Sequence, residues 1–482
     1  GSFKLQKKRE NRPKFNDRQL LYETWARPKR WFKYQPLDLI RKYYGEKIAL
    51  YFAWLGFYTK MLIPAALVGI ICIIFGGATL AEDPSTNDIC DEGRLGNTVM
   101  CPRCDEICPY WRLKAGCMYS QFTYVFDNPA TVCFSVFMSI WATLFLELWK
   151  RRQSELAWHW DLNDLEMEEQ SIRPQFQTRV KTMRVNPYTK EKEPYLPLHN
   201  KIARILASGV SVLFFLCLVL AFVFGVIIYR IIIAHMFFNW GESFQPYAMT
   251  ATSVTAAIIN LIVIMILNWL YTMLARWLTE LECPATNQAF ENSFTLKVFL
   301  FQFINFYSSL FYIAFVKGKF VGVPNSTQYT IFKKYRLEDC GTAGCMPELV
   351  IQLSIIMVGK QALNNIMEIA IPWIRTWIKS WRAKVSRQEE TEEAGSNRWE
   401  KDYALDPTTY NMLIPEYLEM CIQYGFITLF VAAFPLAPLC AFINNLFELR
   451  LDAYKFVVTF RRPTPLRAKN LGQSWSWRLL LV

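Results

Sequence analysis

Eight long apolar segments constrain the fold of this chain more than any other feature of its sequence. Each reaches the roughly 20 residues with which an α-helix crosses the hydrocarbon core of a bilayer. Lipid offers no partner to an unpaired backbone polar group, so the segments are predicted to be helices. The chain is therefore predicted to be an all-α polytopic membrane protein. The spans lie near residues 50–80, 129–149, 204–235, 248–278, 296–318, 347–378, 413–434 and 436–460.

Lysine and arginine residues set the predicted orientation of these spans. They are dense before the first span, as in KLQKKR, and again in the loop at 150–202. The loop at 81–128 instead has four basic residues against eight acidic ones. Because cytoplasmic loops carry the excess of Lys and Arg, the N-terminus is predicted to be cytoplasmic, and with eight spans so is the C-terminus. The net charge of +12 fits loops that face anionic lipid, and no nucleic-acid partner is expected.

This topology divides the chain into a membrane domain with cytoplasmic flanks. A basic pre-membrane segment is predicted at 1–47, a transmembrane domain at 48–460 and a cytoplasmic tail with a divergent end at 461–482. Within the transmembrane domain, 81–128 is predicted to be an outer loop and 383–411 a cytoplasmic linker.

Cysteines gather in the two loops that are predicted to lie outside. The C-x2-C spacing in CPRCDEIC also suits zinc, but disulfides are expected because these loops face an oxidising compartment. The number of outer cysteines is odd, so one of them pairs elsewhere or stays free. A glycosylation acceptor sequence begins at Asn325 in the second loop. The cysteines expected in disulfides are Cys90, Cys101, Cys104, Cys108, Cys117, Cys340 and Cys345.

Carboxylates occur in the sixth, seventh and eighth spans, where a charge in hydrocarbon costs kilocalories unless it is compensated. The spacing within each span is three or four residues, which places each set on one face of its helix. The spans alternate in direction, and a rise of about 1.5 Å per residue then brings all three sets to the inner third of the bilayer. The residues are Asn364, Glu368, Glu416, Glu419, Glu448 and Asp452, with Asn444 on the same span as the last two.

Five carboxylates and an amide oxygen form a set of ligands for a hard cation. No histidine or cysteine joins them, which disfavours zinc, copper and iron. Ca²⁺ tolerates crowded bridging carboxylates better than Mg²⁺, and five negative charges suit two Ca²⁺ ions. The alternative is that the acids pair with Arg450 and Lys360, but Arg450 points off their shared face and two cations do not neutralise five acids. Binding of ions would draw the helices together, so the site is predicted to be a switch.

The sequence resembles the anoctamin family of calcium-activated chloride channels and phospholipid scramblases. The resemblance rests on stretches such as FDNPATVCFSVFMSIWATLFLELWKRR, NNIMEI, PEYLEMCIQYGF and INNLFELRLDAYKF. It implies that Asn364 and the five acids above are calcium ligands, with Asn444 as an accessory ligand. It also implies a homodimer with one pathway per subunit, lined by helices three to seven. Anoctamins have ten membrane helices, so about eight are expected here, in a fragment, an isoform or a trimmed protein.

Polar residues in the fourth to sixth spans are the candidates for the transport pathway. Individually they are ordinary hydrogen-bonding partners between helices. Together they would form a hydrophilic groove that spares a lipid headgroup the cost of entering hydrocarbon. Anion conduction would instead need fixed positive charge, which Lys360 supplies. The candidates are Thr255, Asn260, Gln302, Asn305, Ser354, Lys360 and Gln361.

The expected activity is calcium-activated phospholipid scrambling with accompanying ion conduction. The resemblance to the scramblase-like members includes a glutamine at position 302, where chloride channels of the family carry lysine. Two alternatives stay open, a calcium-activated chloride channel and a tethering protein that transports nothing. The expected partners are membrane lipids, chloride and other small ions, and the expected location is the plasma membrane or an internal membrane such as the endoplasmic reticulum. The chain shows no P-loop, nucleophile elbow or HExxH pattern, so an enzyme is not expected.

Overall fold

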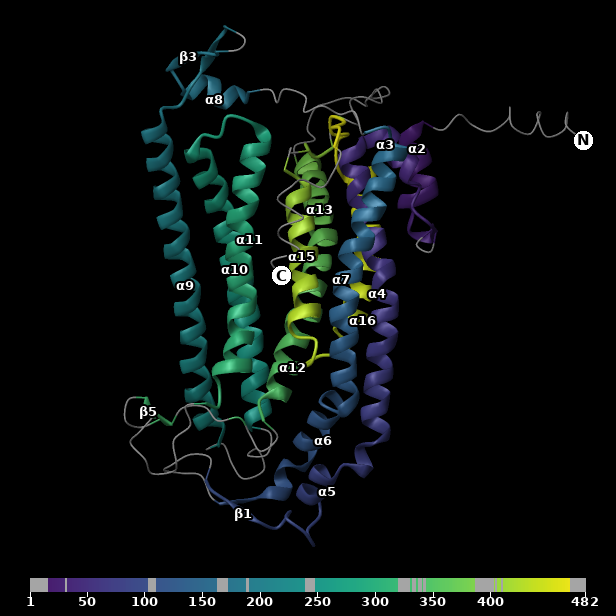
Figure 1. The fold of residues 1–482 in the computed structure, drawn as a ribbon, viewed down its shortest axis with the longest axis vertical. Helices are drawn as coiled ribbons and strands as arrows, with labels where there is room; N and C mark the ends of the chain where they lie inside the picture. Colours follow the sequence, from purple (N-terminus) through teal and green to yellow (C-terminus); the bar gives the residue numbers. More distant parts are fainter. Residues whose placement is uncertain are drawn as a thin grey trace, which may run out of the picture.

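Long helices running side by side make up most of the computed structural model (Figure 1). The predictions at Cys104, Cys108 and Asn325 and most of the predicted linker fall outside the residues that the structure describes. The described residues are 16–30, 33–102, 110–162, 172–187, 190–238, 248–319, 330–331, 335–336, 340, 344–385, 403, 405–408 and 411–468.

Helical segments occupy the positions of all eight predicted spans. Six segments within the described part are long and apolar enough to cross a membrane, as expected for a multi-pass membrane protein. In chain order the segments are α4 (Glu46–Ala78), α7 (Pro129–His159), α9 (Leu198–Phe238), α10 (Ala248–Glu282), α11 (Asn287–Phe311) with the π-turn η6 (Tyr312–Val316), α12 (Met346–Ser354) with the π-turn η7 (Ile355–Gly359) and α13 (Lys360–Val385), α15 (Leu413–Leu429), and α16 (Ala437–Tyr454) with the π-turn η8 (Lys455–Thr459).

The last two segments are shorter than the others. Helix α15 has 17 residues and α16 has 18, and both carry acidic side chains. Pro435 and Pro438 follow α15; Pro438 lies in the first turn of α16, where its missing N–H costs nothing. The assignment of α15 and α16 as membrane spans therefore stays a prediction.

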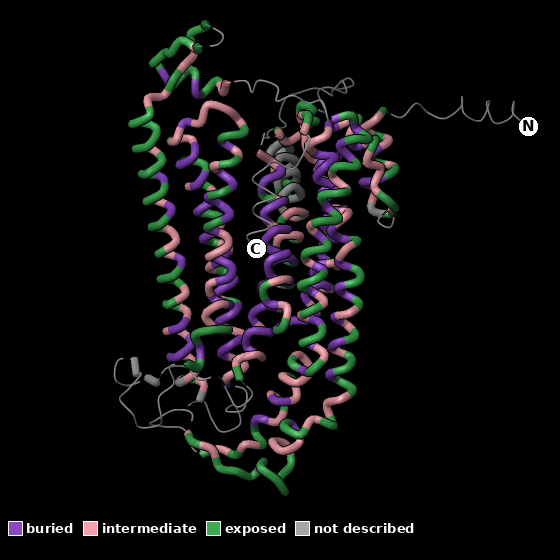
Figure 2. Tube along the Cα trace, in the orientation of Figure 1, coloured by how far each residue is buried: buried purple, intermediate pink, exposed green. Residues whose placement is uncertain are grey.

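The helices pack in two neighbouring groups. Helices α9, α10 and α11 contact one another on one side of the bundle, and α4 contacts α7 and α16 on the other (Figure 1). One apolar core holds α4, α7, α15 and α16 together, and a second joins α9, α10, α11 and α15. Large apolar side chains of α4 and α9 such as Leu67, Ile71 and Val210 are exposed, as a lipid-facing surface requires. Exposed positions recur along both helices (Figure 2).

Short elements cap the two ends of the bundle. The described parts of the loops predicted to be outer lie at one end, and the short helices near the N-terminus lie at the other (Figure 1). These elements are α2 (Asp17–Leu21), η1 (Tyr22–Ala26), η2 (Pro28–Arg30), α3 (Leu37–Tyr44), η3 (Leu80–Glu82), α5 (Pro84–Cys90), η4 (Leu113–Gly116), α6 (Cys117–Phe126) and α8 (Pro174–Arg179), with the antiparallel pairs β1 (Val99–Met100) and β2 (Trp111–Arg112), β3 (Met183–Val185) and β4 (Lys192–Pro194), and β5 (Thr330–Ile331) and β6 (Tyr335–Arg336).

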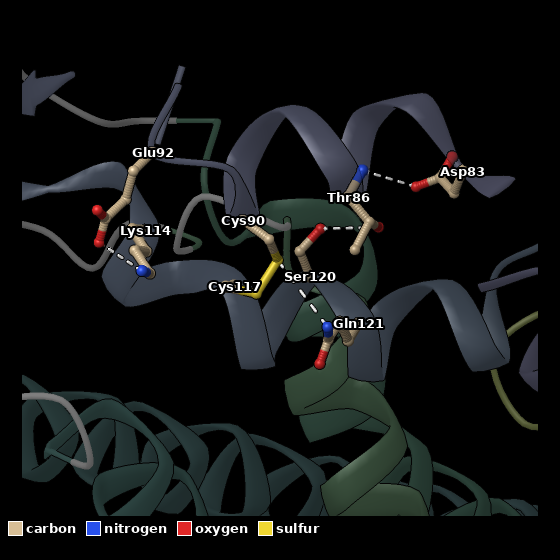
Figure 3. Close-up of a disulfide and its surroundings, with 8 residues drawn as sticks. All are labelled: Asp83, Thr86, Cys90, Glu92, Lys114, Cys117, Ser120 and Gln121. Carbon is tan, nitrogen blue, oxygen red and sulfur yellow. Dashed lines mark hydrogen bonds and ion pairs between the residues drawn. A yellow bond between two sulfur atoms is a disulfide. The ribbon is translucent and has the colours of Figure 1, made fainter. Parts of the chain in front are cut away.

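A disulfide fixes the first outer loop. Cys90 at the end of α5 is bonded to Cys117 at the start of α6, and the Thr86 and Ser120 hydroxyls meet beside it at 3.3 Å (Figure 3). Next to the disulfide, Lys114 donates to Glu92 Oε1 at 2.5 Å. This hydrogen bond and the lysine charge lower the pKa of the Glu92 carboxyl.

The other outer cysteines behave in two ways. Cys340 and Cys345 form a second disulfide in the later loop. Cys101 has a free, exposed thiol, so the disulfide expected at this position is not found in the part of the chain described. Its nearest cysteines in the sequence, Cys104 and Cys108, lie outside that part.

Candidate cation site

Three helices carry the predicted acidic residues to one place in the bundle. Helix α13 carries Asn364 and Glu368, α15 carries Glu416 and Glu419, and α16 carries Asn444, Glu448 and Asp452. Helix α16 packs against both α13 and α15. The sets face the same space because residues three or four apart lie on one side of a helix.

The carboxylate oxygens of two of these helices approach each other closely. Glu368 on α13 and Glu448 and Asp452 on α16 each place one oxygen within 4.8 Å of the others. On α15, Glu419 accepts a hydrogen bond of 3.0 Å from the Asn364 side chain. Asn444 is held at the edge of the group by a 3.4 Å hydrogen bond from Asn365.

Sequence reasoning missed Lys455, the basic residue at the centre of this group. Its ammonium nitrogen lies 3.0 Å from Glu368 Oε1, 2.9 Å from Glu416 Oε1 and 2.9 Å from Asp452 Oδ1. One lysine therefore links acids from all three helices. A signal for it was present, because Lys455 follows Asp452 by three residues and shares its helix face.

The two basic residues weighed from the sequence lie elsewhere. Arg450 points away from the acids, as its spacing predicts, and donates to the backbone oxygens of Trp25 and Lys33. Lys360 lies 3.8 Å from Glu419 Oε1, with its ammonium group 4.7 Å from the centre of the Phe306 ring. Two lysines thus face five carboxylates in the described structure, which leaves the group with an excess of negative charge.

Several buried oxygens of the group have no hydrogen-bond partner among the described residues. Glu448 is 1% exposed and its Oε1 atom is unpaired, as is Oε2 of Glu368. A buried carboxylate oxygen without a donor is costly, and a hard divalent cation satisfies several such oxygens at once. These residues therefore fit a Ca²⁺ site by their chemistry.

Side chains from other helices hold α16 and the π-turn that follows it in place through hydrogen bonds. Tyr51 of α4 donates a 2.5 Å hydrogen bond to Asp452 Oδ2. After Asp452 in the chain, Phe456 O accepts a hydrogen bond of 2.8 Å from Tyr44, and Val457 O and Phe460 O accept hydrogen bonds from Arg18. The position of the acids on α16 thus depends on the first helix and on the N-terminal segment.

The predicted pathway residues lie mainly at contacts between helices. Asn260 and Gln352 both donate to the Ser309 hydroxyl, at 3.0 and 2.8 Å, and join α10, α11 and α12. Gln302 donates to Asn268 at 3.0 Å, Asn305 to the Ile264 backbone at 3.1 Å, and Thr255 and Ser354 bond to their own helices. Lys360 and Gln361 line a small pocket between α13, α15 and α16 together with Glu419 and Asn444.

A buried ion group at the outer end of the bundle escaped sequence reasoning. Glu348 at the start of α12 accepts hydrogen bonds from Arg230 of α9 and from Lys317, which follows η6, the latter at 2.5 Å. All three side chains are at most 5% exposed. Arg230 and Glu348 are 118 residues apart in the chain, so no local spacing indicated the pair.

Comparison with known proteins places the chain in a family. Residues 40–480 match the family described as anoctamin, calcium-activated chloride channel. The chain belongs to the anoctamin family. Residues 2–37 also match the dimerisation domain of anoctamins, so the segment predicted only as a basic flank has a family assignment of its own.

Individual anoctamins are similar along almost the whole chain. Mouse anoctamin-4 is 48% identical over 98% of this chain and 49% of its own length. Human anoctamin-3 is 48% identical over 95% of this chain and 46% of its own length, and human anoctamin-1 is 44% identical over 95% and 50%. The chain thus spans about half the length of these curated relatives.

Proposed function

We propose that this chain is a calcium-activated phospholipid scramblase with accompanying ion conduction. The observation that carries the proposal is the convergence of carboxylates from α13, α15 and α16 on one buried point. A group of acids that holds helices from distant parts of the chain together makes helix position depend on charge compensation. Two Ca²⁺ ions are expected to bind per subunit. The proposed ligands are Asn364, Glu368, Glu416, Glu419, Glu448 and Asp452, with Asn444 as an accessory ligand.

The switch would act through helix α13. When compensating charge is lost, the acids of α13 repel those of α15 and α16, and when charge is restored the helices come together. Helix α13 begins directly after the π-turn η7, and such π-turns inside helices are frequent at functional sites. The part of α13 that carries Asn364 and Glu368 would therefore move relative to α12.

The transport path would open between α10, α11 and α12. Asn260, Ser309 and Gln352 are paired with one another in the described arrangement, and this pairing supports a closed groove. If α12 and α13 shift, the same polar groups become available to lipid headgroups and to water. Headgroups would then cross along a polar surface while the acyl chains stay in lipid.

A calcium-activated chloride channel is the second candidate. Buried basic side chains favour it, because Arg230 and Lys317 both contact Glu348 and Lys360 lies 3.8 Å from Glu419 Oε1. The family description also names chloride channels. Gln302 favours scrambling over anion conduction, because it adds no fixed positive charge at the contact between α10 and α11.

Reconstitution into liposomes tests these candidates. The full chain is inserted into vesicles with fluorescent lipid, and lipid scrambling and chloride flux are measured with Ca²⁺ and with a chelator. The proposal expects both signals only with Ca²⁺, and their loss at low micromolar Ca²⁺ in Glu416→Gln but not in the exposed control Glu147→Gln. Chloride flux without scrambling would establish the channel, and neither signal would favour the third candidate, a membrane-tethering protein.

Assembly and location complete the proposal. The match of residues 2–37 to the anoctamin dimerisation domain supports a homodimer. We place the dimer in the plasma membrane, with an internal membrane such as the endoplasmic reticulum as the alternative. Cross-linking of the tagged protein in cell membranes and surface biotinylation would test the two statements separately.

A further inference from the structure

Lys455 fills the centre of the acidic group as a cation would. Its ammonium group donates hydrogen bonds to Glu368 and Glu416, at 3.0 and 2.9 Å, and forms a third ion pair with Asp452 at 2.9 Å. The lysine side chain is 13% exposed, so little solvent screens these contacts. The group therefore has an internal counter-ion before any ion arrives.

The backbone that carries Lys455 is hydrogen-bonded to other elements, whereas its side chain is joined to the acids through its charged end. Lys455 opens the π-turn η8, whose carbonyl groups accept hydrogen bonds from Tyr44 and Arg18. A lysine side chain has a flexible four-carbon stem with a charged end. The ammonium can thus leave the acids by rotation about its own stem, without unfolding the turn.

We propose that Lys455 is a tethered competitor for divalent cations at this site, an inference that rests on the proposed function. The oxygens that Lys455 occupies belong to three of the acids proposed to bind Ca²⁺. The lysine must move away before those oxygens are free. The free-energy cost of breaking its three ion pairs lowers the apparent affinity of the site for the divalent ion. Lys455 thereby sets the cation concentration at which the helices respond, and when no ion is present it compensates only part of the charge that pushes them apart.

The charge balance explains why a divalent ion can displace Lys455 from the acids. One ammonium provides a single positive charge, whereas Glu448 remains buried with an unpaired oxygen beside it. A divalent ion brings twice the charge and no tether, so it compensates the acids better at sufficient concentration. A monovalent ion brings no more charge than the ammonium group does. Lys455 therefore disfavours the binding of K⁺ and Na⁺ at these acids.

Calcium binding to purified variants tests the proposal. Isothermal titration would compare the full wild-type chain with Lys455→Met, which keeps the apolar stem, with Lys455→Arg, which keeps the charge, and with the exposed control Lys150→Met. Lys455→Met should bind Ca²⁺ at least about fivefold more tightly, the lower end of the usual coupling between two sites. Its melting temperature in chelator should fall, while Lys455→Arg and Lys150→Met should stay closer to wild type in both measurements.

Unchanged or weaker Ca²⁺ binding by folded Lys455→Met would overturn the inference and leave the proposed function standing. If wild type itself binds no Ca²⁺, both fail together. A second measurement needs no variant: lysine acetylation of the wild type, read by mass spectrometry, should increase at Lys455 when Ca²⁺ is added and stay constant at Lys150. Equal labelling of Lys455 with and without Ca²⁺ would overturn the proposal even if Lys455→Met does not fold.

Discussion

Tyr51 of α4 donates its hydroxyl proton to Asp452 of α16 across a distance of 2.5 Å, and both side chains are fully buried. The two residues lie 401 positions apart in the chain. The contact couples the first long helix to an acid of the candidate cation site, and it takes up one of the two Asp452 oxygens.

Replacing Tyr51 with phenylalanine should lower stability most when no divalent ion is present. A hydrogen bond to a charged acceptor contributes about 1.5–3 kcal/mol, and its loss leaves the buried Asp452 oxygen unpaired. Thermal unfolding in chelator should therefore begin at a lower temperature, and Ca²⁺ should restore part of the loss. Tyr110→Phe, at an exposed position in the outer loop, is the matched control. An equal shift in both variants would show that the contact has no special role.

Neutralising Glu448 should shift calcium activation to higher concentrations. Glu448→Gln removes a negative charge from the most buried part of the acidic group while keeping the side-chain size. Loss of one charged ligand should raise the half-activating Ca²⁺ concentration by at least about tenfold. Scrambling or current measured over a Ca²⁺ series gives the answer, with Glu147→Gln as control. An unshifted series would contradict the site.

Introducing a lysine at position 302 should increase anion preference if this position borders the pathway. A lysine at 302 keeps a donor toward Asn268 and adds one positive charge between α10 and α11. The reversal potential under a chloride gradient should then move toward the chloride equilibrium value. Gln302→Met, which adds no charge, is the control. A reversal potential identical to that of wild type would place Gln302 away from the ions.

The ion group of Arg230, Lys317 and Glu348 should be sensitive to loss of Glu348. Glu348→Gln leaves Arg230 and Lys317 buried without their shared carboxylate, and breaking a buried pair typically costs about 3–5 kcal/mol. Unfolding of purified protein should show a loss of this size, and the double variant Arg230→Gln/Glu348→Gln should recover part of it. If the double variant loses the sum of the two single effects, the residues are not coupled.

Removal of the first disulfide should destabilise the outer loop independently of calcium. Cys90 and Cys117 are 27 residues apart, and closure of a loop of this length contributes about 3–4 kcal/mol in the chain-entropy model. The double variant Cys90→Ala/Cys117→Ala should therefore unfold at lower denaturant concentration with and without Ca²⁺. Cys101→Ala removes a free thiol and should leave the transition where it is.

Much of the architecture follows from local patterns in the sequence. The apolar segments predict the long helices because an α-helix satisfies its backbone N–H and C=O groups within a single segment, as lipid requires. The spacing of Glu416 and Glu419 predicts a shared face, and the structure places that face toward the acids of α16 through Lys455. Such features depend on residues that are close in the chain.

The contacts that sequence reasoning missed depend on distant residues. Arg230, near the end of α9, and Glu348, at the start of α12, meet through the fold, and the sequence around neither residue indicates the other. Lys455 was overlooked because Arg450 lies between the acids in the sequence, although Arg450 is on the opposite face and contacts the N-terminal segment. Helix faces, rather than proximity along the chain, decide which charge compensates another.

The guanidinium of Arg18 donates to the carbonyl group of Val457, in the π-turn that begins with Lys455, and to that of Phe460, directly after this turn. Arg18 belongs to the stretch that matches the anoctamin dimerisation domain. A force on that stretch would therefore act on the turn through these two hydrogen bonds. The segment that matches the dimerisation domain is thus joined directly to the backbone that carries Lys455.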